Sequence, residues 1–223
     1  MSTSVFISKS LHDVADLALF LETRGIELIA HSFLTFEAVA SNLPEKFDCI
    51  FFGSPRSVRF FLSNHSTPEG TRFACAGQKT AETLSELGHT PDFIASQSGN
   101  IDASSCAFGK WCGDATVLFP LSETSNKSYT KHLDSRKVLE MVVYRTSISS
   151  LKLPVCTIYI FTSPSNVTGF LNENTLRPES KVIAWGQTTA EALESRHLPC
   201  DHVLSNSSEQ DLINTLNTHF FCV

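Results

Sequence analysis

The chain has 223 residues, of which 42% are hydrophobic and 18% charged, and this ordinary globular composition excludes wholesale disorder. The formal net charge is -6, and the 17 Lys and Arg residues are scattered without a block, which argues against binding to nucleic acids or anionic membranes. No apolar run reaches the roughly 18 residues that span a bilayer, and the first residues lack the pattern of a signal peptide, so we expect a cytoplasmic protein.

Apolar runs alternate with amphipathic stretches along the chain. Strands are predicted at residues 5–7, 49–52, 72–76 and 115–119, and helices at 11–23, from 55 onward, at 78–87 and at 125–133. Ser54 supplies an N-cap and Pro55 the first residue of the second of these helices. The same order of elements recurs at residues 155–161, 164–172, 181–185, 187–195 and 202–204.

Two extended segments, residues 27–36 and 138–145, are long for strands of a small sheet. Each follows the first predicted helix of its half of the chain. A pair of equivalent long strands is compatible with a crossing between two domains.

The chain contains an internal duplication. Residues 52–62 match residues 161–171, and residues 77–84 match residues 186–193, both at an offset of 109 with no gap between the blocks. Fourteen positions are identical to their partners: 52, 54, 55, 58, 61, 62, 77, 78, 80, 81, 82, 84, 92 and 96. We therefore expect two copies of one unit, each of the usual size of a domain. Apolar strands alternating with helices predict an α/β fold with one parallel sheet, covered on both faces, in each copy.

The repeated motifs are strand-to-helix turns, and in parallel sheets ligands bind beyond the carboxyl ends of the strands. Residues 52–55, 76–80, 161–164 and 185–189 each offer free backbone N–H groups and a hydroxyl at the start of a helix. The four turns predict a donor-rich cleft between the domains, suited to a ligand with several carboxylates or phosphates. A purely structural role is the alternative for each residue: Ser54 and Ser163 also serve as helix caps, and Gly77 and Gly186 as turn residues.

No familiar catalytic or metal-binding motif is present. The seven Cys residues include no CxxC pair, and the eight His residues form no HxH or HExxH pattern, which predicts buried, reduced thiols and no structural metal. An enzyme built on this chain would act mainly by holding a reactive substrate in one conformation.

The motifs resemble those of uroporphyrinogen-III synthase. The resemblance is carried by residues 161–167 (FTSPSNV), 181–193 (KVIAWGQTTAEAL) and 142–146 (VVYRT) in one half of the chain. Residues 51–55 (FFGSP) and 77–80 (GQKT) match the family's other domain. The order and spacing of these short motifs extend the resemblance over essentially the whole chain.

The resemblance implies two similar parallel-sheet α/β domains joined by a two-stranded β-ladder. Domain 1 would be discontinuous and comprise residues 1–32 and 148–223, domain 2 would comprise 37–140, and residues 33–36 and 141–147 would form the ladder. The family converts hydroxymethylbilane, a linear tetrapyrrole with eight carboxylates, into cyclic uroporphyrinogen III. It inverts the terminal ring, eliminates water and uses no cofactor or metal.

By the same resemblance, Tyr144 is the candidate for hydrogen-bonding the departing substrate hydroxyl. The predicted substrate-binding residues are Ser54, Gln78, Thr80, Ser163, Ser165, Lys181, Gln187, Thr188 and Thr189. The expected partners are hydroxymethylbilane and, transiently, hydroxymethylbilane synthase, and the expected state is a monomer.

Two alternatives remain. A non-catalytic two-domain module that binds or senses an anion would use the same duplicated fold, and it predicts Tyr144 packed inside one domain rather than with its hydroxyl in the cleft. A structural or interaction protein would expose the Phe-rich segments 51–61 and 220–221 as an apolar patch.

Overall fold

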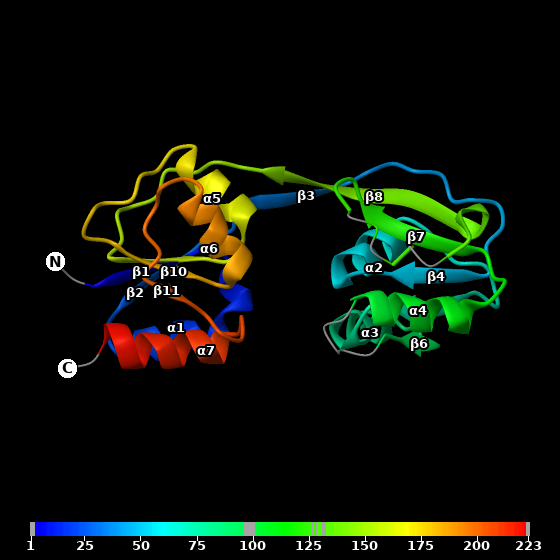
Figure 1. Cartoon of the computed structure of the whole chain (residues 1–223), viewed down its shortest axis with the longest axis horizontal. Coiled ribbons are helices and arrows are strands. Elements are labelled where there is room, and N and C mark those ends of the chain that lie inside the picture. The colour runs from blue at the N-terminus through cyan, green and yellow to red at the C-terminus, as the bar shows by residue number, and fades with distance from the viewer. Residues whose placement is uncertain (1–2, 96–100, 126, 128, 131–132, 222–223) are drawn as a thin grey trace. The chain divides into compact units, whose positions relative to one another are not determined.

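The computed structural model describes residues 3–95, 101–125, 127, 129–130 and 133–221. It divides into two compact units: unit 1 comprises Met1–Thr35 and Ser147–Val223, and unit 2 comprises Phe36–Thr146. Each unit contains its own sheet and its own core, as the duplication predicts (Figure 1).

Unit 1 is built on a parallel sheet in the order β11-β10-β9-β1-β2. The strands are β1 (Ser4–Ile7), β2 (Glu27–Ala30), β9 (Ile158–Phe161), β10 (Lys181–Ala184) and β11 (His202–Val203). The helices are α1 (Ala15–Glu22), α5 (Pro164–Leu171), α6 (Gln187–Glu194) and α7 (Glu209–Thr215), with a short 3-10 turn at Leu11–Asp13 and a π-helical turn at Leu216–Phe220. Figure 1 shows α5 and α6 on one face of this sheet and α1 and α7 on the other.

The two faces of the unit 1 sheet follow from the alternation of side chains along each strand. In β1, Val5 and Ile7 pack toward α1 and α7, whereas Phe6 packs toward α5 and α6. All four residues of β1 are buried, which is why its sequence is apolar almost throughout.

Unit 2 has a sheet in the order β3-β8-β7-β4-β5-β6. Its strands are β3 (Leu34–Ala38), β4 (Cys49–Phe52), β5 (Arg72–Cys75), β6 (Phe93–Ile94), β7 (Val117–Ser122) and β8 (Val138–Ile148). Its helices are α2 (Pro55–Leu62), α3 (Gln78–Glu86) and α4 (Ile101–Cys112), with a 3-10 turn at Ser135–Lys137. The pairs β8-β7, β7-β4, β4-β5 and β5-β6 are parallel.

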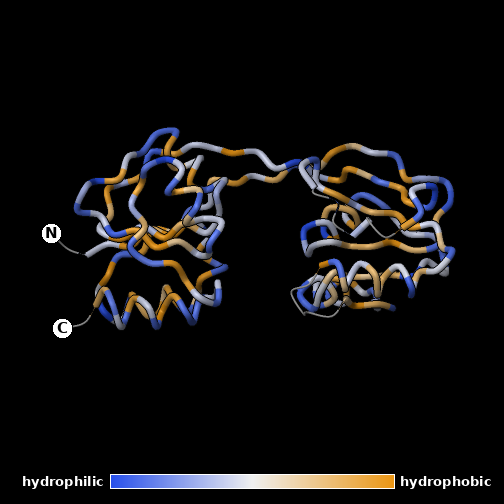
Figure 2. The backbone as a smooth tube through the Cα atoms, in the orientation of Figure 1, coloured by the Kyte–Doolittle hydropathy of each residue, from blue (hydrophilic) through white to orange (hydrophobic). Residues whose placement is uncertain are grey.

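The core of unit 2 also has two halves. Ile50 and Phe52 of β4 pack with α2 and α3, and Cys49 and Phe51 pack with α4. Figure 2 shows the hydrophobic colour concentrated along the strands within each unit. The parallel α/β architecture predicted from the sequence is confirmed.

Strands β3 and β8 carry both crossings of the chain between the units. Val39 N donates to Val143 O, and Thr35 Oγ1 donates to Ser147 O, so the two strands run antiparallel. The boundary between the units falls after Thr35 in β3 and after Thr146 in β8.

The extended segment predicted over residues 27–36 is not one continuous strand. The structure divides it into β2, in the sheet of unit 1, and β3, in the sheet of unit 2, with a break at residues 31–33. The local sequence pattern cannot reveal this break, because residues far along the chain stabilise it. Phe33 N donates to Asn166 Oδ1, and Ser149 N donates to Phe33 O.

The predicted helix at 125–133 lies partly outside the described residues, and its described members are not helical. Hydroxyl groups there bond to the backbone instead: Thr130 Oγ1 donates to Lys127 O, and Lys127 N donates to Ser125 Oγ. The sequence analysis also missed α4 and α7.

The cysteine prediction holds only in part. Six cysteines are free in the described chain; burial raises the pKa of the Cys49 and Cys75 thiols to about 12, whereas Cys106 and Cys200 are exposed. Segments 51–61 and 220–221 do not form the exposed apolar patch of the interaction-protein hypothesis: Phe51, Phe52 and Phe61 are buried, and Phe60, Phe220 and Phe221 are partly buried against the cores. Within the described chain, no helix has the length and apolar character needed to cross a membrane.

Candidate active site

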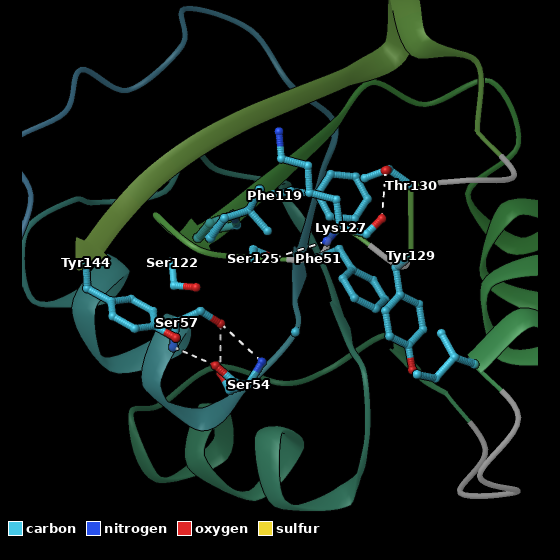
Figure 3. Close-up of a pocket in the computed structure, with 14 residues that line it drawn as sticks. Phe51, Ser54, Ser57, Phe119, Ser122, Ser125, Lys127, Tyr129, Thr130 and Tyr144 are labelled. Atoms are coloured by element: carbon cyan, nitrogen blue, oxygen red, sulfur yellow. Dashed lines mark hydrogen bonds between the residues drawn. The ribbon is translucent and has the colours of Figure 1, made fainter. Parts of the chain in front are cut away.

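A cavity of about 310 Å³ opens at the carboxyl end of the unit 2 sheet. Four aromatic side chains form its apolar walls, namely Phe51, Phe119, Tyr129 and Tyr144, and five hydroxyl-bearing residues line it as well, namely Ser54, Ser57, Ser122, Ser125 and Thr130 (Figure 3). Lys127 is the single charged residue among the described residues that line the cavity. This described lining therefore combines an apolar surface with hydroxyls and one positive charge, and it holds no carboxylate.

Helix α2 contributes the serines through its N-terminal cap. Ser54 Oγ accepts a hydrogen bond from Ser57 N at 3.2 Å, and Ser57 Oγ accepts one from Ser54 N at the same distance, which completes a reciprocal capping box. The Ser57 hydroxyl donates to Ser54 O at 2.7 Å. The same cap that starts the helix thus fixes two hydroxyls at the cavity.

Tyr144 reaches the cavity because strand β8 contains a β-bulge. Leu121 lies opposite Val142 and Ser122 lies opposite Tyr144, so Val143 is an additional residue on β8. In a regular strand Tyr144 would share the face of Val142, which is 36% exposed. With the bulge, both Val143 and Tyr144 face the core that contains α2.

The ring of Tyr144 is held firmly while its hydroxyl is left available. The side chain is 8% exposed; it stacks on Phe60 at 5.1 Å and meets Phe36 edge-on at 6.3 Å between ring centroids. The Arg56 guanidinium lies 3.4 Å from the Phe36 ring centroid and 6.0 Å from that of Tyr144. Within the described chain the Tyr144 hydroxyl makes no hydrogen bond. It is also not one of the fully buried polar atoms that lack a partner, so it can be reached from the cavity. Figure 3 shows the side chain extending from β8 toward the start of α2.

Tyr144 meets part of each expectation drawn from the sequence. Its ring packs inside unit 2, as a binding module predicts, and the residue lines a cavity of that unit, whereas the placement of its hydroxyl in a cleft between the domains stays a prediction. Its position alone does not separate the two hypotheses.

Lys127 occupies a strained turn beside the cavity. Its φ of 52° lies in the left-handed region, which non-glycine residues rarely adopt and which often marks a functional site. Its Nζ lies 2.5 Å from Glu140 Oε2. The ammonium is therefore paired with a carboxylate beside the cavity.

Tyr129 forms the opposite wall. Its ring lies 4.6 Å from that of Phe51, and its hydroxyl donates to Ala76 O at 3.4 Å. Burial raises the pKa of the Tyr129 phenol, against the opposing effect of a hydrogen bond with Ser104, so this wall stays uncharged at neutral pH.

The other predicted binding residues differ in how far their side chains are exposed to solvent. In unit 2, Gln78 is exposed at the first residue of α3, whereas Thr80 is 4% exposed and turned into the core. In unit 1, Gln187 and Thr188 are exposed at the start of α6, and Thr189 is 2% exposed. The buried threonines of the two repeats thus support the structural role rather than contact with a ligand.

Ser163 caps α5, where its hydroxyl accepts from Asn166 N, and Ser165 lies in the first turn of that helix. Lys181 is not brought together with them. It is the first residue of β10, whereas Ser163 and Gln187 follow the last residues of their strands, and its Nζ is 2.7 Å from Asp201 Oδ1. The first and last residues of parallel strands lie at opposite edges of a sheet, so Lys181 does not lie with Ser163 and Gln187, and its role in substrate binding stays a prediction.

The sequence analysis missed most of the cavity lining. Ser57, Ser122, Ser125, Lys127, Tyr129 and Thr130 were not proposed as site residues. A usable signal was present, because the hydroxyl-rich run after Pro120 follows the carboxyl end of a buried strand, the same rule that identified Ser54. The described residues contain no cluster of three His, Cys, Asp or Glu side chains arranged to hold a metal ion.

Comparisons with known proteins agree with the fold. The crystal structure of uroporphyrinogen-III synthetase from Helicobacter pylori 26695 is 17% identical over 97% of this chain and 99% of that chain, with a TM-score of 0.71. A mutant uroporphyrinogen III synthase from the extremely thermophilic bacterium Thermus thermophilus is 14% identical over 97% of this chain and 98% of that chain, with a TM-score of 0.55. No curated protein matches the sequence.

The family model described as uroporphyrinogen-III synthase HemD matches residues 15–214, which is most of the chain and includes both units. This match favours the enzyme over the non-catalytic module. The chain belongs to the uroporphyrinogen-III synthase family.

Proposed function

We propose that this chain closes hydroxymethylbilane into uroporphyrinogen III, with inversion of the terminal pyrrole ring and loss of water, and that the cavity of unit 2 holds the reacting end of the substrate. The reaction is that of a hydro-lyase in heme biosynthesis. Family membership supports this reaction, and the residues that line the cavity support the unit 2 cavity as the site of the reaction.

The observation that carries the proposal is the available hydroxyl of Tyr144 in a cavity whose described lining has one cation and no carboxylate. The substrate is an anion with eight carboxylates, and because the Lys127 ammonium is already paired with Glu140, the hydroxyl donors of the lining carry the argument for its binding. The aromatic walls offer an apolar surface for the pyrrole rings, and the serine and threonine hydroxyls can donate to carboxylates.

In this arrangement Tyr144 donates a hydrogen bond to the departing hydroxyl of the substrate while its C–O bond breaks. Phe36 and Phe60 hold the phenol ring, so the donor is already oriented when the substrate arrives. Ring closure is easy once the hydroxyl has left. The remaining task of the protein is therefore to position the terminal ring so that the correct carbon reacts.

The proposal includes a cytoplasmic monomer that needs no cofactor and meets hydroxymethylbilane synthase only transiently. The cavity volume of about 310 Å³ is at the lower end of the range for sites that enclose small ligands. It accommodates part of a tetrapyrrole, so other carboxylates of the substrate must bind elsewhere on the chain.

A product assay tests the proposal. Hydroxymethylbilane is generated in situ, the purified full-length chain is added, and the products are oxidised and separated as type I and type III uroporphyrin. Spontaneous closure yields type I. We expect a type III fraction that grows in proportion to the protein. Type I alone, from protein with a cooperative thermal unfolding transition, would overturn the enzymatic proposal and restore the binding-module hypothesis.

A further inference from the structure

Two histidines of unit 1 bring their rings together at the outer edge of the sheet. His202 is the first residue of the edge strand β11, and His219 lies in the π-helical turn Leu216–Phe220 that follows α7. The two ring centroids are 5.3 Å apart, and the ring planes are inclined by 31°. Because the residues are distant along the chain, no HxH spacing reveals the pair in the sequence.

The fold directs both side chains to the same face of the sheet. Val203 packs on the side of α5 and α6, so the alternation of side chains along β11 points His202 to the side covered by α1 and α7. Helix α7 leads directly into the turn that carries His219. The contact between the two imidazoles therefore follows from the packing of α7 on the sheet.

The turn that carries His219 is held in place by α1. The Arg24 guanidinium donates to Asn217 Oδ1 at 3.1 Å, and the rings of Phe20 and Phe221 stack with centroids 6.3 Å apart. These contacts fix the residues two positions before and two positions after His219. The imidazole pair is therefore already arranged by the fold.

The ring nitrogens of both histidines are available to a ligand. His219 is exposed and His202 is half-buried. The Cys200 thiol donates to the backbone carbonyl of His202 at 3.4 Å and leaves the ring untouched. Within the described part of the chain, no hydrogen bond or ion pair involves a ring nitrogen of either residue. Each neutral imidazole can therefore present one nitrogen lone pair to a metal ion.

The separation of the two rings fits a tetrahedral ion. A histidine nitrogen lies about 2.0 to 2.1 Å from zinc, and this places the centroid of its ring about 3.2 Å from the ion. Two centroids 5.3 Å apart then subtend about 110° at the ion, which is the angle of tetrahedral coordination.

The other repeat shows that packing at this edge does not require imidazoles. Phe93 of β6 occupies the position equivalent to His202, 109 residues earlier. Its ring centroid lies 5.6 Å from that of Phe108 and 5.3 Å from that of Trp111, both in α4. Each unit thus packs a ring of its last short strand against a ring from the helical segment that follows, but only unit 1 uses rings that carry nitrogen ligands.

We propose that His202 and His219 form a two-histidine site for a divalent transition-metal ion, with zinc as the ion whose preferred geometry the pair fits. Imidazole is a ligand that suits zinc, copper and nickel. The ion joins the edge strand to the turn after α7, and so stabilises unit 1. This inference is independent of the proposed function, because the ion has no part in that reaction and the test measures no turnover.

The experiment titrates zinc chloride into the full-length chain, free of any affinity tag, by isothermal titration calorimetry in a buffer that does not chelate metals. We expect the wild type to bind one zinc ion per chain with a Kd in the micromolar range. His219→Phe and His202→Phe each keep a ring contact of the kind made by Phe93 but remove one of the two ligands, so each should weaken binding by at least about tenfold.

Two matched variants should bind zinc as the wild type does. His12→Phe makes the same substitution at an exposed histidine of unit 1, beside Asp13 in the 3-10 turn before α1. Cys200→Ser removes the thiol closest in sequence to the pair. Weaker binding by Cys200→Ser would overturn a site made of two imidazoles, because it would identify the thiol as a ligand.

Thermal melts measure the stabilisation separately. Zinc at about 100 times its Kd should raise the melting temperature of the wild type by about 5 °C, and that of His219→Phe by less than about 1 °C. Without zinc the two proteins should melt alike, which shows that the variant is folded.

The outcomes are decisive in both directions. Loss of zinc binding in both histidine variants, with His12→Phe and Cys200→Ser unaffected, would support the site. A wild type that binds no zinc, or binding that persists in either histidine variant, would overturn it. If His202→Phe fails to fold, His219→Phe decides the question, because His219 is exposed and its substitution leaves the core intact.

Discussion

The two units start the same helix in the same way and then use it differently. Helix α2 in unit 2 and helix α5 in unit 1 both begin with a serine cap followed by proline. Three residues after the cap, Ser57 of unit 2 closes the capping box with Ser54. The equivalent residue of unit 1, Asn166, reaches outward and accepts a hydrogen bond from Phe33 N at 2.9 Å.

A second pair of equivalent positions, Phe60 in α2 and Gly169 in α5, also has different contacts in the two units. Phe60 of α2 stacks on the ring of Tyr144. Its counterpart in α5 is Gly169, where an added Cβ would lie 2.3 Å from Phe33 Cβ. One helix thus supports the residue proposed for catalysis, and the other anchors the chain just before β3 leaves unit 1. The two units thus share the strand, the serine cap and the helix, but the residues at positions 57 and 166 and at positions 60 and 169 have different contacts.

The largest expected effect is the loss of rate in Tyr144→Phe, which tests the role of the tyrosine that α2 supports. Tyr144→Phe retains the ring contacts with Phe36 and Phe60 but removes the hydroxyl. We expect formation of type III uroporphyrin to slow about 100-fold, the usual size for losing one preorganised donor, with the melting temperature unchanged. The product assay and a thermal melt measure the two quantities.

The control for Tyr144→Phe is a tyrosine of unit 1. Tyr159 accepts a hydrogen bond from Cys156 N at 2.8 Å in the core, so Tyr159→Phe should cost about 1 kcal/mol of stability and leave kcat unchanged. A wild-type rate in Tyr144→Phe would remove Tyr144 from the mechanism.

Gly169→Ala tests the close approach in α5. The new methyl group would overlap Phe33 Cβ and lie 3.0 Å from Ser149 O, and neither atom belongs to the flexible end of a side chain. We expect a loss of about 2 kcal/mol in the free energy of unfolding, since overpacking outweighs the better helix propensity of alanine. Denaturant titration measures it. Gly53→Ala in unit 2 is the matched control, because its added Cβ meets nothing within 4 Å; equal losses in the two variants would contradict the explanation.

Asn166→Ser makes the unit 1 helix copy the residue of unit 2. The serine can still complete a local cap, but it cannot reach Phe33 N, which would lose its buried acceptor. We expect a loss of about 1 to 2 kcal/mol. Ser57→Ala, which removes only the reciprocal half of a cap, should cost less, about 0.5 to 1 kcal/mol. The same denaturant titration ranks them, and the reverse order would show that Asn166 is not the stronger anchor.

The smallest effect concerns acid stability. Burial raises the pKa of Asp201, but hydrogen bonds from Lys181 and the Val182 N–H and the charge of Lys181 outweigh it and lower the pKa below its usual range. A carboxyl whose folded pKa is lowered adds stability above its unfolded pKa and loses it as pH falls through the folded value. Asp201→Asn should therefore cost less than about 1 kcal/mol at neutral pH, and the difference from wild type should vanish in acid.

The repeat supplies the control for Asp201→Asn. Asp92 accepts from Phe73 N in the same way, but the residue equivalent to Lys181 is Arg72, whose guanidinium lies 4.8 Å from the centroid of the Trp111 ring. At neutral pH, Asp92→Asn removes a carboxylate that has the same backbone hydrogen bond but no lysine partner within the described chain, so thermal melts should show a smaller loss than for Asp201→Asn. An equal loss in both variants would dismiss the role of Lys181.

Much of the fold could be predicted because its signals are local. The apolar strand β4, the serine cap of α2 and the repeat at an offset of 109 each depend on neighbouring residues or on comparison within the chain. The segment 27–36 could not be predicted correctly, because its break depends on Asn166 and Ser149, more than 110 residues away. The turn around Lys127 was misread as a helix because its serine and threonine hydroxyls compete for the backbone.

The sequence by itself determined the α/β class, the duplication and the family, since all three follow from residue order and spacing. Only the tertiary structure decided which candidates share a site. The bulge at Val143 turns Tyr144 to the cavity side. It depends on the register of β8 against β7, which the residues of β8 alone do not predict. Lys181 and Lys9 are both lysines next to strands, yet one lies at the amino end of β10 beside a carboxylate and the other follows β1 and reaches across β9 to the ring of Trp185. Such placement depends on contacts between distant strands, which the pattern along any one strand does not contain.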